Sequence, residues 1–279
     1  MNYLNLYYPA ITMDAITMEY NLEEIEPALV KRRMSRSYSI CCEEDDKNVS
    51  NGMCPKYTLN WGIKFNSLHW SQNHDFISGH ELPPNIKSLC CERIQLLNKD
   101  PEAFEKACKD TLVFCDMDGV LADFEAGFWS LKGCLPDDYP KHLLWPTILQ
   151  DKRFFAELPP MPNALTLWQE IKDFKPIILT GCPNSNAAKA AKVEWCKQYL
   201  GPNCLRIQNL AEMALYPDYD YYIIITTAAK KHTFTRLNSI LIDDRLETSE
   251  SWENANGIFL HYDESKTQEI INIVKMLRT

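Results

Sequence analysis

Residues 114–124 read FCDMDGVLADF, and they continue an apolar run, Leu112–Phe114, of the kind that forms a buried β-strand. Two carboxylates one residue apart, Asp116 and Asp118, follow this run, and Gly119 comes directly after them. Successive side chains of a strand alternate between its two faces, so Asp116 and Asp118, two residues apart, begin on the same side, and a turn directly after them would hold both at the end of the strand. Gly119 permits that turn because glycine adopts backbone angles that other residues resist. The stretch therefore predicts one strand of an α/β sheet with an acidic site at its carboxyl end.

The crowding of Asp116 and Asp118 indicates a particular chemistry. Like charges held this close are costly unless a cation or a shared proton compensates them. Carboxylate oxygens are ligands of magnesium, and a carboxylate can also act as a nucleophile. The pair thus favours a magnesium-dependent site with a carboxylate nucleophile. The alternative, a solvated acidic turn after a strand, is common for such a pair taken alone.

Composition and charge narrow the class of protein. The chain has 279 residues, of which 46% are hydrophobic and 24% charged, as in globular proteins that form one large domain or two modest ones. Its net charge of −9 disfavours extended nucleic-acid binding and attachment to anionic membranes. We find neither an apolar run of membrane-spanning length nor the pattern of a secretory signal. The eleven cysteines, with doublets at Cys41–Cys42 and Cys90–Cys91 that lack zinc-ligand spacing, are expected to be reduced thiols of a cytoplasmic protein.

Residues 1–108 contain no motif whose chemistry we can assign. We expect an N-terminal extension or small domain of unclear fold, with a loop or linker at residues 43–52, where the chain is polar and ends in Asn-Gly. His69, His74 and His80 do not have the spacing of metal ligands. A protein partner would be expected to bind through this N-terminal region.

Two more apolar runs end in polar groups. Residues 176–181 (PIILTG) end in a hydroxyl and a glycine, which together with nearby backbone N–H groups can bind a phosphate. Residues 239–245 (SILIDDR) carry paired carboxylates, Asp243 and Asp244, at the end of the apolar run. Strands that alternate with helical patterns imply a parallel sheet with right-handed crossovers. Polar groups at the ends of three apolar runs indicate a functional site more specifically than any one of these groups alone.

The string DMDGVLADFE at residues 116–125 resembles the first motif of the haloacid dehalogenase (HAD) superfamily, Asp-x-Asp-Gly-x-x-x-Asp, and within it the 5'(3')-deoxyribonucleotidases. Thr180-Gly181 and Asp243-Asp244 match the second and fourth motifs of that superfamily. The resemblance covers about the last three-fifths of the chain. It implies a Rossmann-like α/β catalytic domain at residues 109–279, with a small helical cap at about residues 125–160.

The resemblance also implies a magnesium-dependent phosphatase. Asp116 would attack the phosphorus and carry the phosphoryl group, and Asp118 would protonate the leaving alcohol and then activate water. Magnesium would be held by Asp116, the backbone carbonyl of Asp118 and Asp244, with Asp243 behind them.

A lysine of the superfamily's third motif, together with Thr180 and Gly181, would bind the phosphoryl oxygens in this scheme. Its position after a strand end makes Lys231 the first choice and Lys230 the reserve. Lys192, on the preceding helix, is a third candidate because some branches of the superfamily take this lysine from a helix.

Aromatic residues in and beside the expected cap are candidates for substrate contact, since the nucleotidase resemblance suggests stacking on a nucleobase. They are Phe124, Phe128, Trp129 and Trp145. The alternative, that they pack the cap's own core, is open for each of them.

The expected substrate is a nucleoside 5'-monophosphate or a similar small phosphomonoester. A phosphoprotein, a sugar phosphate or a polynucleotide end would need the same catalytic residues. A hypothesis of another class is a catalytically inactive HAD-fold protein that serves as a binding or adaptor protein.

Overall fold

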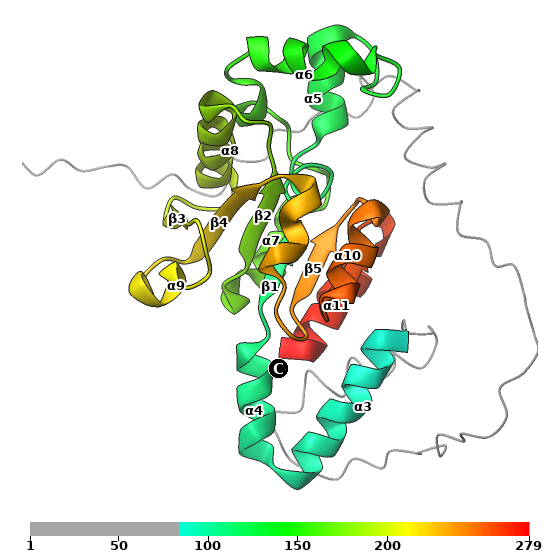
Figure 1. Ribbon diagram of the computed structural model, residues 1–279, viewed down its shortest axis with the longest axis vertical. Coiled ribbons are helices and arrows are strands. Elements are labelled where there is room, and N and C mark those ends of the chain that lie inside the picture. Colours follow the sequence, from blue (N-terminus) through cyan, green and yellow to red (C-terminus); the bar gives the residue numbers. More distant parts are fainter. Residues whose placement is uncertain (1–83, 279) are drawn as a thin grey trace, which may run out of the picture. The chain divides into compact units, whose positions relative to one another are not determined.

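The computed structural model describes residues 84–278, so the predictions for the linker at residues 43–52 and for the three histidines lie outside the described residues. Six strands form one sheet in which every pairing is parallel, in the order β3-β4-β2-β1-β5-β6 (Figure 1). The strands are β1 (Val113–Cys115), β2 (Ile177–Gly181), β3 (Cys204–Arg206), β4 (Tyr221–Thr226), β5 (Ile240–Asp243) and β6 (Ile258–His261). The predicted Rossmann-like parallel α/β sheet is therefore confirmed.

Helices connect the strands and cover the sheet (Figure 1). They are α3 (Pro84–Lys99), α4 (Pro101–Asp110), α5 (Phe124–Lys132), α6 (Lys141–Gln150), α7 (Ala164–Ile171), α8 (Asn186–Tyr199), α9 (Glu212–Leu215), α10 (Ser249–Asn254) and α11 (Thr267–Arg278). Short 3-10 helices lie between them, of which η3 (Phe154–Ala156) and η5 (Ala228–Phe234) matter for the site. Within residues 84–278, we find no helix with the length and apolar character needed to cross a membrane.

Strand β1 lies in the middle of the sheet, between β2 and β5. The residue Cys115 is in register with Ile178 on one side and with Ile242 on the other. The chain builds the β2-β4-β3 side first and then crosses β1 to add β5 and β6. In sheets of this kind, ligands bind outside the carboxyl ends of the strands at the point where the strand order reverses. The topology therefore directs attention to the residues that follow β1 and β5.

Both faces of the sheet are buried, which explains the almost unbroken apolar runs of its strands. One hydrophobic cluster holds Cys115 of β1 together with Trp168 of α7 and Trp195 of α8. A second cluster holds the preceding residue, Phe114. Its ring packs edge-on against Trp252 of α10, with 5.2 Å between the ring centres. This alternation fixes the register of β1, because a slip of one residue would send each side chain to the wrong face.

The two helices before β1 share the core of the sheet. Ile86 of α3 belongs to the same buried cluster as the helix α11. Arg93, also buried, donates to the Sγ of Cys108 at 2.9 Å and to the Oγ1 of Thr111 at 2.7 Å. Arg278 at the end of α11 donates to the carbonyl oxygen of Cys108. Residues 84–110 are thus packed onto the α/β unit, and a truncated chain should retain them.

The part of the segment between β1 and β2 that precedes α7 contains α5, α6 and η3, and in Figure 1 α5 and α6 lie beyond the end of the sheet at which β1 finishes. Asp123, the last carboxylate of the first motif, caps α5 by accepting from the backbone N–H of Ala126 at 2.9 Å. The two stems of the segment are tied together, because the N–H of Asp123 donates to Pro159 and that of Met161 to Leu121. Helices therefore occupy the position where the sequence predicts a small cap.

Candidate acidic site at the ends of β1 and β5

The turn after β1 brings its carboxylates to the edge of the sheet. The N–H of Asp116 donates to Ile242 of β5 at 2.8 Å, which extends the pairing of the two strands by one residue. The chain then turns tightly, and Gly119 adopts the left-handed value φ = 83°. A Cβ atom at Gly119 would overlap the carboxylate of Asp244. Glycine is therefore required here both for the backbone angle and for the space that Asp244 occupies.

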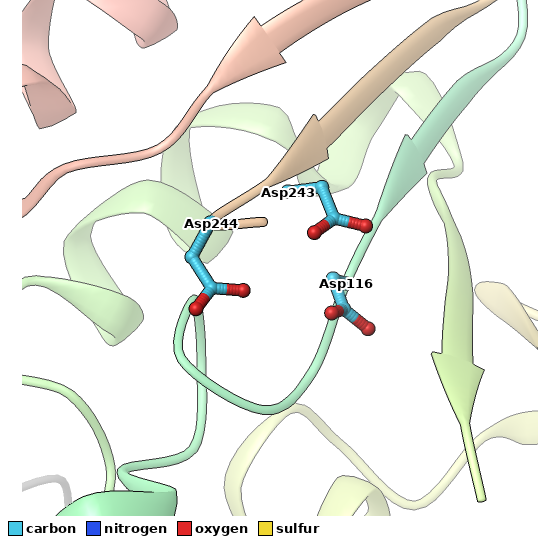
Figure 2. Close-up of side chains that lie close together, drawn as sticks. All are labelled: Asp116, Asp243 and Asp244. Carbon is cyan, nitrogen blue, oxygen red and sulfur yellow. The ribbon is translucent and has the colours of Figure 1, made fainter. Parts of the chain in front are cut away.

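Three carboxylates gather where β1 and β5 end (Figure 2). Asp116 follows β1, Asp243 is the last residue of β5, and Asp244 comes next along the chain. One oxygen from each lies within 4.8 Å of the others. Asp116 and Asp243 are buried and Asp244 is half-buried. Buried like charges at this separation require compensation, which a divalent cation held by oxygen ligands would supply.

A buried lysine, Lys231, joins two of these carboxylates. Its Nζ lies 2.8 Å from Oδ2 of Asp116 and 2.7 Å from Oδ2 of Asp243. Burial lowers the pKa of Lys231, but the charges of Asp116 and Asp243 outweigh burial and raise it above its usual value. Burial and the charge of Asp116 raise the pKa of Asp243, and Lys231 opposes that rise. The lysine is therefore an ammonium at neutral pH, and it holds the two strand ends together.

A second lysine, Lys192 of α8, contacts the other carboxylate of the first motif. Its Nζ lies 2.5 Å from Oδ2 of Asp118 and 3.0 Å from Oγ1 of Thr180, the penultimate residue of β2. The ring of Phe155 in η3 lies over the same Nζ, with 4.5 Å to the ring centre. Burial and the charge of Asp116 raise the pKa of Asp118, and Lys192 opposes them. A carboxyl whose pKa is raised holds its proton more readily, which suits it to general acid chemistry.

Of the three lysines that the sequence offers, two reach the site. Lys231 and Lys192 each contact a carboxylate of the first motif, whereas the side chain of Lys230 is exposed on η5. Gly181 ends β2 beside Thr180, and a Cβ there would come within 3.3 Å of the backbone nitrogen of Ala228. The close approach of these two backbones keeps the end of β2 near the start of η5, which carries Lys231.

Some acceptor atoms in the site lack a protein donor. In the described part of the chain, Oδ1 of Asp116 and Oδ1 of Asp118 are buried and have no hydrogen-bond partner. Buried polar atoms without partners are rare in folded proteins, and they mark places where water, an ion or a ligand binds. The four carboxylates and two ammonium groups carry a formal charge of −2 when all are ionised. One divalent cation would neutralise it.

The predicted aromatic contacts fall into two groups. Phe124 contacts Trp145, which is 44% exposed, with 6.1 Å between the ring centres, and it also contacts Phe154 and Phe155. These four residues are named here the aromatic cluster, and Phe155 connects it to Lys192. Sequence reasoning did not select Phe155, because nothing in its local pattern shows that it faces a lysine on α8.

Phe128 differs from this group. Its side chain is fully buried and packs against Tyr139 at 5.3 Å between ring centres. We therefore assign Phe128 to the core of the segment and not to substrate contact, since the inward face of α5 needs an apolar filler. Trp129, the next residue, is half-buried.

Comparison with known proteins assigns no family or function to this chain. No protein-family model matches the chain, and no curated protein matches it significantly. The function must therefore be argued from the site itself.

Replacing Gly119 by alanine tests whether the turn makes room for Asp244. Gly133 is the matched control, because it also has positive φ (70°) but a Cβ there would meet nothing within 4 Å. Both substitutions should cost about 1–2 kcal/mol of unfolding free energy from backbone strain. Only Gly119→Ala should also displace Asp244 and abolish the rise in melting temperature that Mg²⁺ gives the wild type. An equal Mg²⁺ effect in the two variants would contradict this assignment.

Proposed function

We propose that this chain is a magnesium-dependent phosphohydrolase of the HAD type, which works through a phosphorylated aspartate. The observation that carries the proposal is the pairing of each carboxylate after β1 with its own buried lysine, beside the Asp243-Asp244 pair. An acidic turn in solvent would need neither the burial nor the two ammonium groups, and burying a lysine costs several kcal/mol unless it is paired.

Asp116 is the nucleophile in this proposal. Its Oδ2 is held by Lys231 and its orientation is fixed by the backbone bond to β5, so the carboxylate needs little reorganisation before attack. One of its oxygens forms a bond to phosphorus as the bond from phosphorus to the ester oxygen breaks. The product of this step is an aspartyl phosphate on Asp116.

Asp118 moves the protons. It gives its proton to the leaving alcohol in the first step, and in the second it takes a proton from the water that attacks the aspartyl phosphate. The hydroxyl of Thr180 at the end of β2 and the ammonium of Lys231 on η5 would stabilise the charge on the phosphoryl oxygens. Gly181 leaves the backbone at this edge free of a side chain.

The donor set fits magnesium. Asp116, the backbone carbonyl of Asp118 and Asp244 would hold the ion, with Asp243 behind them, and these are the hard oxygen ligands that Mg²⁺ prefers. When bound, the ion would offset the repulsion between the carboxylate nucleophile and the phosphate dianion.

A nucleoside 5'-monophosphate is the substrate that the site supports best. The aromatic cluster, with its half-exposed Trp145, offers a ring surface that reaches the site through Phe155. Bases stack on such surfaces, and the helical segment above the site would act as the cap that limits access of water. The resemblance of the first motif to nucleotidases points the same way.

Phosphate release from a panel of substrates tests the activity. The panel holds deoxyribonucleoside and ribonucleoside monophosphates, sugar phosphates and phosphopeptides, each with Mg²⁺ and with a chelator. We expect Mg²⁺-dependent release from nucleotides, a loss of roughly 10³-fold or more for Asp116→Asn, and no change for the surface control Asp173→Asn. Release from another class would keep the mechanism and replace the substrate. A folded wild type that releases no phosphate would contradict the proposal and favour the adaptor hypothesis.

Trp145 tests the nucleobase contact. Because stacking of a base on an aromatic side chain contributes about 1–3 kcal/mol, Trp145→Ala should raise KM for a nucleotide roughly 5- to 150-fold. The kinetics on p-nitrophenyl phosphate, which has no base, should stay near those of the wild type. Tyr216→Ala is the control, because Tyr216 is an exposed aromatic residue that follows α9, outside the segment between β1 and β2. If Trp145→Ala leaves KM for the nucleotide unchanged, the base does not bind at this surface.

A further inference from the structure

Lys192 is an unusual residue for its place in the fold. It lies on the face of α8 that packs on the sheet, where its neighbours on the helix are Ala188, Ala191 and Trp195, and its side chain is fully buried. A buried ammonium costs several kcal/mol unless its partners compensate, and an apolar residue would fill this position at lower cost. Its close contacts with Asp118, Thr180 and the ring of Phe155 therefore call for a function.

The two buried lysines have different partners. Lys231 contacts Asp116 and Asp243, whereas Lys192 contacts Asp118 and Thr180 and, at 4.0 Å, the Sδ of Met117. Lys192 holds Oδ2 of Asp118, and within residues 84–278 the other oxygen, Oδ1, has no hydrogen-bond partner. One oxygen of the carboxyl is therefore anchored by Lys192, whereas the other is buried and keeps an unused acceptor position, and the side chain as a whole is 24% exposed. This is the arrangement that a directed proton transfer requires.

We propose that Lys192 is a positioning residue for Asp118, which fixes this carboxyl for proton transfer to the leaving group and from water. The inference rests on the proposed function of the site. In the first step the ester P–O bond breaks, a bond from Asp116 to phosphorus forms, and the proton of Asp118 moves to the departing oxygen. In the second step a water oxygen bonds to phosphorus, the bond to Asp116 breaks, and the water proton returns to Asp118.

The ring of Phe155 also helps to hold the ammonium of Lys192 in place. Phe155 covers Nζ from the side of the segment between β1 and β2, and a cation over an aromatic face is stabilised more strongly where water is excluded. Thr180 holds the ammonium from the side of β2. These two contacts fix the position of the ammonium. The ion pair therefore selects the rotamer of Asp118 in which Oδ2 contacts Lys192.

Leaving-group dependence distinguishes positioning of the acid from a structural role. A p-nitrophenolate ion departs without a proton, whereas the alkoxide of benzyl alcohol needs one, and the two esters present rings of similar size. A residue that positions the general acid should therefore matter much more for benzyl phosphate than for p-nitrophenyl phosphate. A residue that only supports the fold, or only binds the phosphate that both substrates share, should affect the two equally.

The experiment compares kcat/KM on these two substrates, with Mg²⁺, for the full chain and for Lys192→Met. Methionine keeps the unbranched apolar chain and removes the ammonium. We expect the ratio of kcat/KM for benzyl phosphate to that for p-nitrophenyl phosphate to fall at least tenfold. Lys197→Met, an exposed lysine on the same helix, should leave both values unchanged.

Thermal unfolding establishes that the variants are folded, and Lys192→Gln is assayed in the same way if the methionine variant does not fold. If Lys192→Met leaves the ratio of the two kcat/KM values unchanged, whether both values fall together or neither falls, the role of Lys192 is overturned. The proposed function still stands in that case, provided that the wild type is active on both esters. A wild type inactive on both esters overturns the proposed function and this inference with it.

Discussion

The site depends on the neutralisation of buried carboxylates by two buried lysines. Lys231 joins the ends of β1 and β5 through Asp116 and Asp243, and Lys192 joins α8 and the end of β2 to Asp118. Removing one partner of such a buried pair costs about 3–5 kcal/mol, because the other charge is left uncompensated. The same contacts that hold β1, β2, β5, α8 and η5 together therefore hold the reactive groups in place.

The sheet topology makes this neutralisation possible. Since β1 lies between β2 and β5, three neighbouring parallel strands deliver their carboxyl ends to one edge of the sheet. Each of them contributes polar groups there: Asp116 and Asp118 after β1, Thr180 at the end of β2, and the Asp243-Asp244 pair at the end of β5. The apolar residues that precede these groups are buried on both faces of the sheet, and this packing holds the strand ends rigidly.

Strands β1, β2 and β5 and the polar residues at their ends were predictable from the sequence, because each of these apolar runs ends in the residues that carry the chemistry. The choice among the lysines was not, since Lys192 lies 74 residues from Asp118 and meets it only through the packing of α8 on the sheet. Phe128 shows the same limit. Its aromatic character suggested a substrate contact, but which face of α5 turns inward is decided by packing partners such as Tyr139, remote from the local pattern.

The most direct test of this account is to trap the phosphoryl group on Asp116. Asp118→Asn should still accept the phosphoryl group from p-nitrophenyl phosphate, whose leaving group needs no proton, but it should hydrolyse the intermediate slowly. The account predicts a burst of about one equivalent of p-nitrophenol per chain and, after acid quenching, a phosphorylated peptide that contains Asp116. Steady turnover without a burst, or a phosphoryl group on another residue, would contradict it.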